Sequence, residues 1–89
     1  MSEEAKKYIQ SVAWNRFPAQ ELWIRQDNSF WAFDIEDDHV IFTEGNYRDG
    51  DILFHSTSQP AEDGETLVDS FVEQKRQEGF ECFAIQMRN

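Results

Sequence analysis

The stretch that decides the fold is residues 30–43, which read FWAFDIEDDHVIFT. Every second residue from Trp31 to Ile35 is large and apolar, and successive side chains of a β-strand point to opposite faces of the sheet. Residues 39–43 are rich in the β-branched and aromatic residues that favour strands. Two aspartates stand between the two halves, where a tight turn belongs. The pattern predicts an antiparallel hairpin with Trp31 on its core face.

Upstream of this hairpin, the sequence predicts one helix and one strand. Ser2 is followed by two glutamates, which is typical of a helix start, because a hydroxyl caps the first turn and acids favour the positive end of the helix dipole. Apolar residues then recur at helical spacing, so we expect a helix over residues 3–13, which Pro18 prevents from continuing. Residues 22–25 form a short β-rich run that ends at the turn-forming residues 27–29.

Downstream, the sequence predicts two more strands and a second helix. In chain order we expect a loop over 45–50, a strand over 51–55, a polar connection over 56–64 that contains Pro60, a helix over 64–78 that Gly79 ends, and a last strand over 80–87. Consecutive strands joined by short turns pair antiparallel. The predicted fold class is α+β: an antiparallel sheet of four to five strands, with an N-terminal helix and a second helix packed on one face.

The composition indicates one folded domain over residues 1–89. A chain of this length has room for one core. Eight Phe, three Trp and two Tyr supply it, because each ring buries on the order of 150–250 Å². Trp14 and Trp23 are open to two interpretations, since each can belong to the core or form an exposed contact point for a partner.

The charge is strongly negative, with eighteen Asp and Glu against eight Lys and Arg and a formal net charge of -10. Direct nucleic-acid binding neutralises phosphates with Lys and Arg, and this chain offers few of them, so a nucleic-acid partner is disfavoured. A basic protein surface or a cation suits the field better. Acidity that only maintains solubility is the alternative.

Cysteine content and hydropathy indicate a cytoplasmic protein. The single cysteine, Cys82, has no second cysteine for an internal disulfide, which fits a reducing compartment. The N-terminal residues have no apolar segment of the signal-peptide kind. No stretch approaches the ~18 apolar residues that span a bilayer, so we expect no membrane partner.

Two segments of the sequence resemble a WGR domain. Residues 30–35, FWAFDI, look like the strand of sequence K-F-W-E-I that opens this family, and residues 67–80, LVDSFVEQKRQEGF, resemble its closing helix. The resemblance covers about residues 22–83 and implies an α+β fold. WGR domains contact DNA ends beside poly(ADP-ribose) polymerase catalytic domains, which implies nucleic-acid binding. At the signature position, however, residues 43–50 read TEGNYRDG in place of Trp-Gly-Arg.

Two polar segments are the candidate sites for a partner. The residues that we select in them are Asp34, Glu36, Asp37, Asp38, Tyr47, Arg48, Asp49 and Asp51. Acidic loops of this kind can bind cations. The spacing of a calcium-binding loop is absent here, so we expect solvated turns and no metal site. The acids of residues 62–65 are explained by the start of the second helix.

The sequence indicates no catalytic centre and no cofactor. His39 and His55 fall on different strands, and two histidines without a carboxylate at ligand spacing are weak evidence for a metal. We expect them to be exposed strand residues, and the aspartates before His39 should favour its protonated form. Cys82 has no neighbouring base to activate it as a nucleophile, so we expect it to behave as a small apolar residue.

Three functions remain open. The leading hypothesis is a non-enzymatic binding domain whose partner is a protein with a basic surface. A second is an acidic mimic of DNA, which would carry carboxylates in two rows along one face and inhibit a DNA-binding protein, as some phage proteins do. A third is nucleic-acid binding of the WGR type, which needs a local basic patch formed by Arg25, Arg48, Lys75 and Arg76.

The net charge predicts how stability depends on salt. Repulsion among the carboxylates should destabilise the fold at low ionic strength, and salt screens it within a Debye length of about 8–10 Å. We therefore expect the melting temperature, followed by circular dichroism, to rise as salt is added from near zero. A flat or falling curve would show that local partners already compensate the carboxylates.

Overall fold

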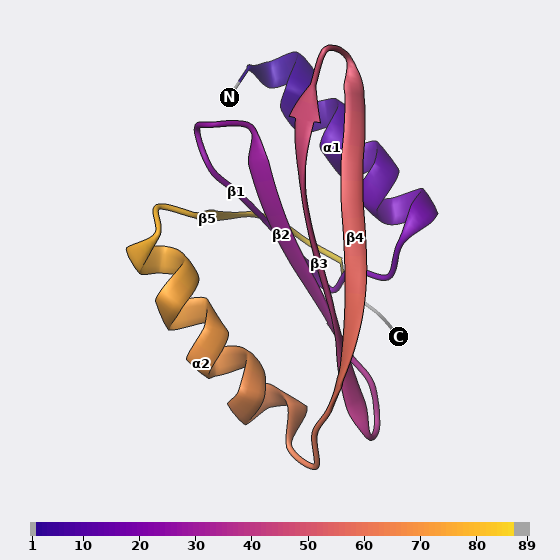
Figure 1. The fold of residues 1–89 in the computed structure, drawn as a ribbon, viewed down its shortest axis with the longest axis vertical. Coiled ribbons are helices and arrows are strands. Elements are labelled where there is room, and N and C mark those ends of the chain that lie inside the picture. Colours follow the sequence, from indigo (N-terminus) through magenta and orange to yellow (C-terminus); the bar gives the residue numbers. More distant parts are fainter. Residues whose placement is uncertain (1, 87–89) are drawn as a thin grey trace.

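The computed structural model describes residues 2–86, and its seven elements form an α+β fold. In chain order they are α1 (Glu3–Arg16), β1 (Glu21–Ile24), β2 (Ser29–Ile35), β3 (His39–Arg48), β4 (Asp51–Pro60), α2 (Gly64–Gln77) and β5 (Glu81–Ile85) (Figure 1). The predicted fold class is confirmed. Within the described residues, neither helix is long and apolar enough to cross a membrane.

The five strands form one antiparallel sheet in the order β4-β3-β2-β1-β5. The predicted hairpin is its centre, with β2 paired to β3 from Ser29 opposite Asn46 to Ile35 opposite Val40. The last strand returns to the far side of the sheet and pairs with β1. The two edges are therefore β4 and β5.

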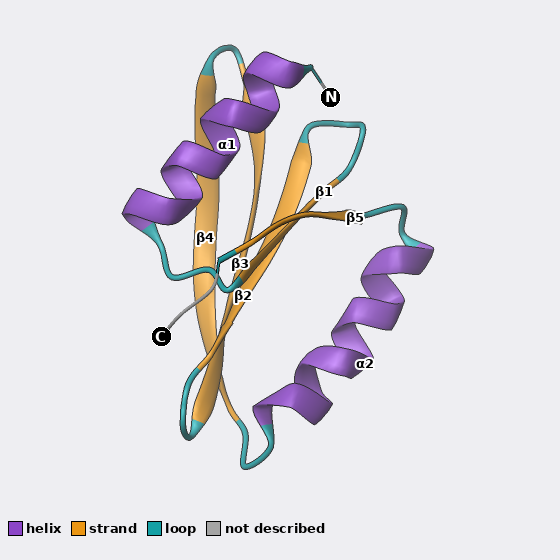
Figure 2. Cartoon of the chain, turned by 180° about the vertical axis from the view of Figure 1, so that it is seen from behind, coloured by secondary structure: helices purple, strands orange, loops and turns teal. Residues whose placement is uncertain are grey.

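The two helices cover opposite faces of the sheet, as Figures 1 and 2 show. The core between α1 and the sheet contains Ile9, Val12, Ala13, Phe17, Ala19, Leu22, Phe30, Ala32 and Ile52. The core on the α2 side contains Trp23, Trp31, Phe33, Val40, Val68 and Phe80. Alternation along β2 divides its residues between these two cores, which is why both faces of this strand are buried.

The tryptophans take different positions in these cores. Trp31 and Trp23 are only 2% and 4% exposed, and their rings meet edge to face at 6.1 Å. Trp14 is partly buried against the α1 core. Of the two interpretations of Trp23, the core interpretation is the one that holds.

Two connections predicted from the sequence are shorter than expected, because the β3–β4 hairpin is longer. Residues 45–48 belong to β3, and only Asp49 and Gly50, both with positive φ, form the turn. Residues 56–60 were expected in a polar connection, but they extend β4. Residues 56–60 are polar because they lie on an edge strand and their side chains are exposed. A strand segment with neither face buried needs no alternation of apolar and polar residues.

The helix ends agree with the sequence. The Ser2 side chain accepts a hydrogen bond from the Ala5 N–H at 3.1 Å, and α1 runs one turn further than expected. Asp63 caps α2 by accepting from Thr66, which lowers the pKa of the Asp63 carboxyl. Gly79 has φ +96°, as its position after α2 predicts. The predicted final strand extended to Met87, which lies outside the described residues.

We expect Gly45→Ala to destabilise the protein by about 1–3 kcal/mol, the usual cost of overpacking. A Cβ at this position would lie 2.1 Å from the Leu53 carbonyl oxygen and 2.8 Å from the Phe30 ring, so two strands would have to separate. Gly50→Asn is the control, because its Cβ meets nothing within 4 Å and asparagine tolerates positive φ. Equal urea midpoints for the Gly45 variant and the wild type would contradict this account.

Candidate functional site

The candidate residues gather in two groups at opposite ends of the β2–β3 pair. Asp34, Glu36, Asp37 and Asp38 lie at or beside the β2–β3 turn. Tyr47, Arg48, Asp49 and Asp51 lie at the β3–β4 turn, beyond the other end. The eight residues therefore do not form one surface.

Asp34 is not solvated, which corrects the expectation for the first acidic segment. It is 0% exposed, because alternation along β2 directs it to the α1 side together with Phe30 and Ala32. A strand buried on both faces leaves no solvated position near its middle. The Asp34 carboxylate is therefore closed to a docking partner in this conformation.

Asp37 and Asp38 form an acidic hollow with a third carboxylate, from Glu62. This acidic hollow, of about 460 Å³, is lined by Asp37, Asp38, Pro60, Ala61 and Glu62. A hydrogen bond from the Ala61 N–H to the Asp38 carbonyl oxygen, at 3.0 Å, joins the β2–β3 turn to the chain between β4 and α2. None of its lining residues, within the described part of the chain, carries a positive charge.

A hydrogen bond with His39 favours the ionised form of Asp38 in the acidic hollow. The His39 Nδ1 lies 2.6 Å from an Asp38 carboxylate oxygen. This hydrogen bond, together with the attraction of the imidazolium, lowers the pKa of Asp38. The Asp38 side chain is still 89% exposed, so it can also meet a cation from solution.

The second group lies around a polar hollow at the β1–β2 and β3–β4 turns. Asp27, Tyr47, Arg48 and Asp49 are among its lining residues. The Tyr47 ring packs edge-on against Tyr8 of α1 at 5.7 Å, and Asp51 accepts a hydrogen bond from the Ile52 N–H at 2.8 Å. Both side chains thus have structural contacts within the chain.

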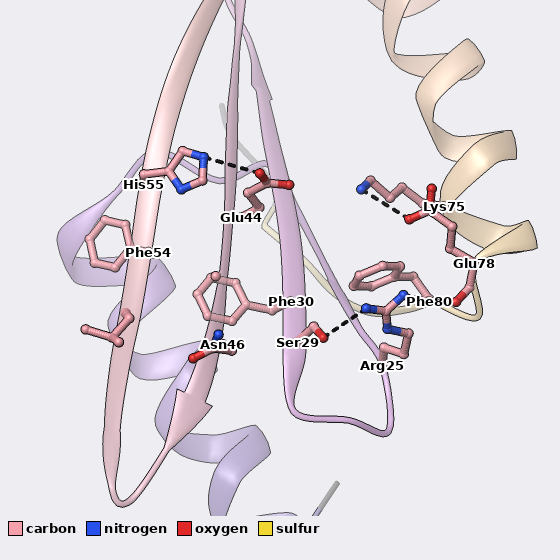
Figure 3. A pocket seen from close by; sticks show the side chains of 12 residues that line it. Arg25, Ser29, Phe30, Glu44, Asn46, Phe54, His55, Lys75, Glu78 and Phe80 are labelled. Atoms are coloured by element: carbon pink, nitrogen blue, oxygen red, sulfur yellow. Dashed lines mark hydrogen bonds and ion pairs between the residues drawn. The ribbon is translucent and has the colours of Figure 1, made fainter.

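A groove of about 480 Å³ opens between β3–β4 and the end of α2 (Figure 3). Its cations already have partners. The Arg25 guanidinium lies 4.5 Å from the Phe80 ring centroid and donates to the Glu78 carbonyl oxygen, and Lys75 lies 3.5 Å from the Glu78 carboxylate. Across the groove, His55 lies 3.2 Å from Glu44. The Arg25 contacts join the chain after β1 to the segment between α2 and β5.

The structure does not bring the histidines together. His39 is opposite Pro60 in the β3–β4 ladder, whereas His55 is opposite Glu44, several residues along it. Among the described residues, no group of three His, Cys, Asp or Glu could hold a metal ion.

Cys82, which we expect to behave as a small apolar residue of an apolar strand, is exposed on the edge strand β5. Desolvation raises the pKa of its thiol, and the Glu21 carboxylate, whose oxygen lies 3.7 Å from the sulfur, raises it further. Both effects favour the protonated thiol, which is a poor nucleophile.

The sequence interpretation missed Glu62 as a member of the acidic hollow. The acids of residues 62–65 are sufficiently explained by the start of α2, so the sequence gives no reason to place Glu62 in a site. The predicted strand also ends at residue 55, five residues before the end of β4. The available signal was Pro60, which is tolerated at the end of an edge strand. Extending β4 to this residue would have aligned it with His39 and predicted the contact.

Comparison with known proteins found no matching family model, curated protein or solved structure. The resemblance to WGR domains therefore stays a prediction from sequence.

We expect Asp27→Asn to lower the melting temperature at neutral pH by a few degrees. Asp27 accepts hydrogen bonds from Ser29 and from Arg25, which lower the pKa of its carboxyl from 3.8 to about 2. The side chain is 57% exposed, so solvent screening limits its contribution to at most about 1 kcal/mol.

The pH dependence tests the cause. A lowered folded-state pKa gives stability that is present above the unfolded value and is lost as pH falls through about 2. The difference between wild type and variant should therefore shrink between neutral pH and pH 2. Asp49→Asn, at an exposed turn, is the control and should melt like the wild type. A difference that does not vary with pH would show that the carboxylate charge is irrelevant.

Proposed function

We propose that this chain is a non-enzymatic binding domain that binds a basic surface of a partner protein at the acidic hollow. The observation that carries the proposal is the convergence of Asp37, Asp38 and Glu62 from two separate connections. A lysine or arginine entering there would meet three carboxylates. The lining residues supply no positive charge, so the partner would supply the cation for Asp37 and Glu62 and would share Asp38 with His39.

The net charge supports this choice of partner. A domain with a charge of -10 attracts cationic surfaces over a Debye length and raises their rate of association. Each exposed charge pair contributes only about 0.2–1 kcal/mol, so a site with three carboxylates reaches a useful affinity only by contacting several cations at once. A basic surface satisfies this condition better than a single ion does.

Nucleic-acid binding, which the WGR resemblance implies, is less well supported. Arg25 lies 3.0 Å from a carboxylate oxygen of Asp27, and Lys75 lies close to Glu78. Phosphates would have to displace these internal partners before they could be neutralised. The same cations also pack over Phe80, so moving them would disturb the core on the α2 side.

Mimicry of DNA is a second candidate, favoured by one feature of α2. Glu65, Asp69 and Glu73 are exposed and recur every four residues, which places them in one row at steps of about 6 Å. A basic groove that normally binds a phosphate backbone could bind such a row. Lys75 and Arg76 follow the row in the last turn of α2 and limit its length.

Two matched variants distinguish these sites. Asp37→Asn/Asp38→Asn/Glu62→Gln removes the acidic hollow, and Glu65→Gln/Asp69→Asn/Glu73→Gln removes the same charge from α2. We expect the first variant to bind a fluorescent oligolysine peptide about tenfold more weakly than the wild type, measured by anisotropy at low salt. The second variant should lose less than about twofold.

The comparison has two contrary outcomes. Equal losses in both variants would show that the peptide responds to net charge alone, and the acidic hollow would not be a site. A larger loss in the α2 variant would move the site to the helix and favour mimicry. Circular dichroism of both variants establishes that each one is folded.

A further inference from the structure

β4 is an edge strand with an open side. It pairs only with β3, and its side chains from His55 to Pro60 are all exposed. The other edge strand, β5, is half as long. Figure 1 shows β4 running along the outside of the sheet.

The ladder fixes which backbone groups of β4 face outward. In an antiparallel pair, residues alternate between hydrogen-bonded and non-hydrogen-bonded positions. The hydrogen bond from the Ala61 N–H to the Asp38 carbonyl places the odd-numbered residues of β4 at bonded positions. The even-numbered residues therefore direct their N–H and C=O groups away from β3.

Two features limit the open part of this edge. The N–H of Ile52 bonds to the Asp51 carboxylate, and Pro60 has no N–H. Between them, Phe54, Ser56 and Ser58 offer three donors and three acceptors. An added strand of about five residues can use all of them.

Natural proteins protect edge strands with charged side chains, Pro, bulges or a covering element. Pro60 ends the open part of β4, and the end of α1 contacts Phe54, but charged side chains and bulges are missing from the strand between these points. Here residues 52–61 contain no Asp, Glu, Lys or Arg, although 29% of the chain is charged. The register with β3 is continuous, and Leu53 is 66% exposed. This edge is therefore suited to pairing with another strand.

We propose that β4 accepts an extended segment of the partner protein as an added antiparallel strand, with Lys or Arg at the end of that segment beside Pro60. This inference rests on the proposed function, because the acidic hollow begins where β4 ends: Pro60 and Ala61 line it. In the antiparallel direction the basic residues precede the uncharged ones. Backbone hydrogen bonds align the segment, and the three carboxylates select its charged end.

A second copy of this chain fits the same edge less well. The end of α1 lies against β4. The ring of Phe17, which follows the helix, packs at a tilt on the Phe54 ring with centroids 4.8 Å apart, and the Arg16 guanidinium lies 5.6 Å from the Phe54 ring centroid. In Figures 1 and 2 this end of α1 extends past β4. Antiparallel pairing of two β4 strands would bring both α1 ends to the same side of the joined sheet, and would join two chains of charge -10. A single added strand avoids both problems.

The segment should also show a side-chain preference. Residues of the added strand on the α1 side lie beside Phe54 and the end of α1, so apolar β-branched side chains suit these positions. On the other side the neighbours are His55 and Thr57, which suit polar side chains. The expected segment alternates accordingly after its basic end.

The test is an NMR titration of the wild-type protein with blocked synthetic peptides. Lys-Lys-Thr-Val-Thr-Val-Thr should bind saturably, shift the amides of Phe54, Ser56 and Ser58, and slow their hydrogen exchange by about tenfold near saturation. Lys-Lys-Gly-Ser-Gly-Ser-Gly carries the same charge without strand propensity and should leave those exchange rates unchanged. Glu-Glu-Thr-Val-Thr-Val-Thr should not bind.

Ser58→Pro and Ser58→Ala give a matched pair of variants. The proline removes an outward N–H that β3 does not use, so the free protein should keep its fold while peptide affinity falls by at least about fivefold. The alanine keeps this N–H and should bind like the wild type. If the proline variant does not fold, the peptide comparison on the wild type still decides the question.

The outcomes separate this inference from the proposed function. If both lysine peptides shift only residues around Asp37 and Asp38 with equal affinity, the acidic hollow binds cations and strand addition is wrong. If neither binds, the proposed function fails as well. Concentration-dependent protection of Phe54, Ser56 and Ser58 without peptide would overturn the choice of partner and assign the edge to a second copy.

Discussion

Burial of both faces of β2 is the constraint on which the rest of the structure depends. Phe30 and Ala32 pack under α1, while Trp31 and Phe33 pack under α2. Neither helix could be removed without exposing large rings, since a chain of this length has little other apolar surface with which to stabilise its fold. The sheet therefore has two covered faces, and free surface remains at its ends, its edges and the outer sides of the helices.

This constraint decides where eighteen acidic residues can lie. Asp34 is the only carboxylate of the described chain that is fully buried in the sheet, although Glu21 and Glu44 lie on the inner strands β1 and β3 with at least partly exposed side chains. The other described carboxylates lie in turns, on the edge strands and on the helices. Turns at one end of a sheet lie close together whatever their separation in sequence. The acidic hollow is a consequence: acids from residues 37–38 and residue 62 meet because the strands that carry them end at the same level.

The sequence was sufficient to predict the elements and insufficient for their lengths. Alternation from Trp31 to Ile35 and the cap signals at Ser2 and Gly79 are local, so they were interpreted correctly. Residues 56–60 could not be assigned to a strand by pattern, because the edge position removes the burial that creates a pattern. The expectation that Asp34 is solvated is wrong because this face of β2 is buried. A polar residue in an alternating strand predicts a solvent-exposed face, but here a helix covers that face as well.

The candidate site was predictable only in part, because it joins features of different origin. Asp37 and Asp38 are visible as an acidic turn, but Glu62 and the open edge of β4 depend on the register of a hairpin whose length was not evident.

The acidic hollow and the open edge of β4 respond differently to solution conditions. Attraction by exposed carboxylates is screened by salt, whereas backbone pairing along an uncharged strand is much less sensitive to it. A partner that used both would associate rapidly through charge and remain bound through the strand, so its on-rate would depend on ionic strength more than its off-rate would.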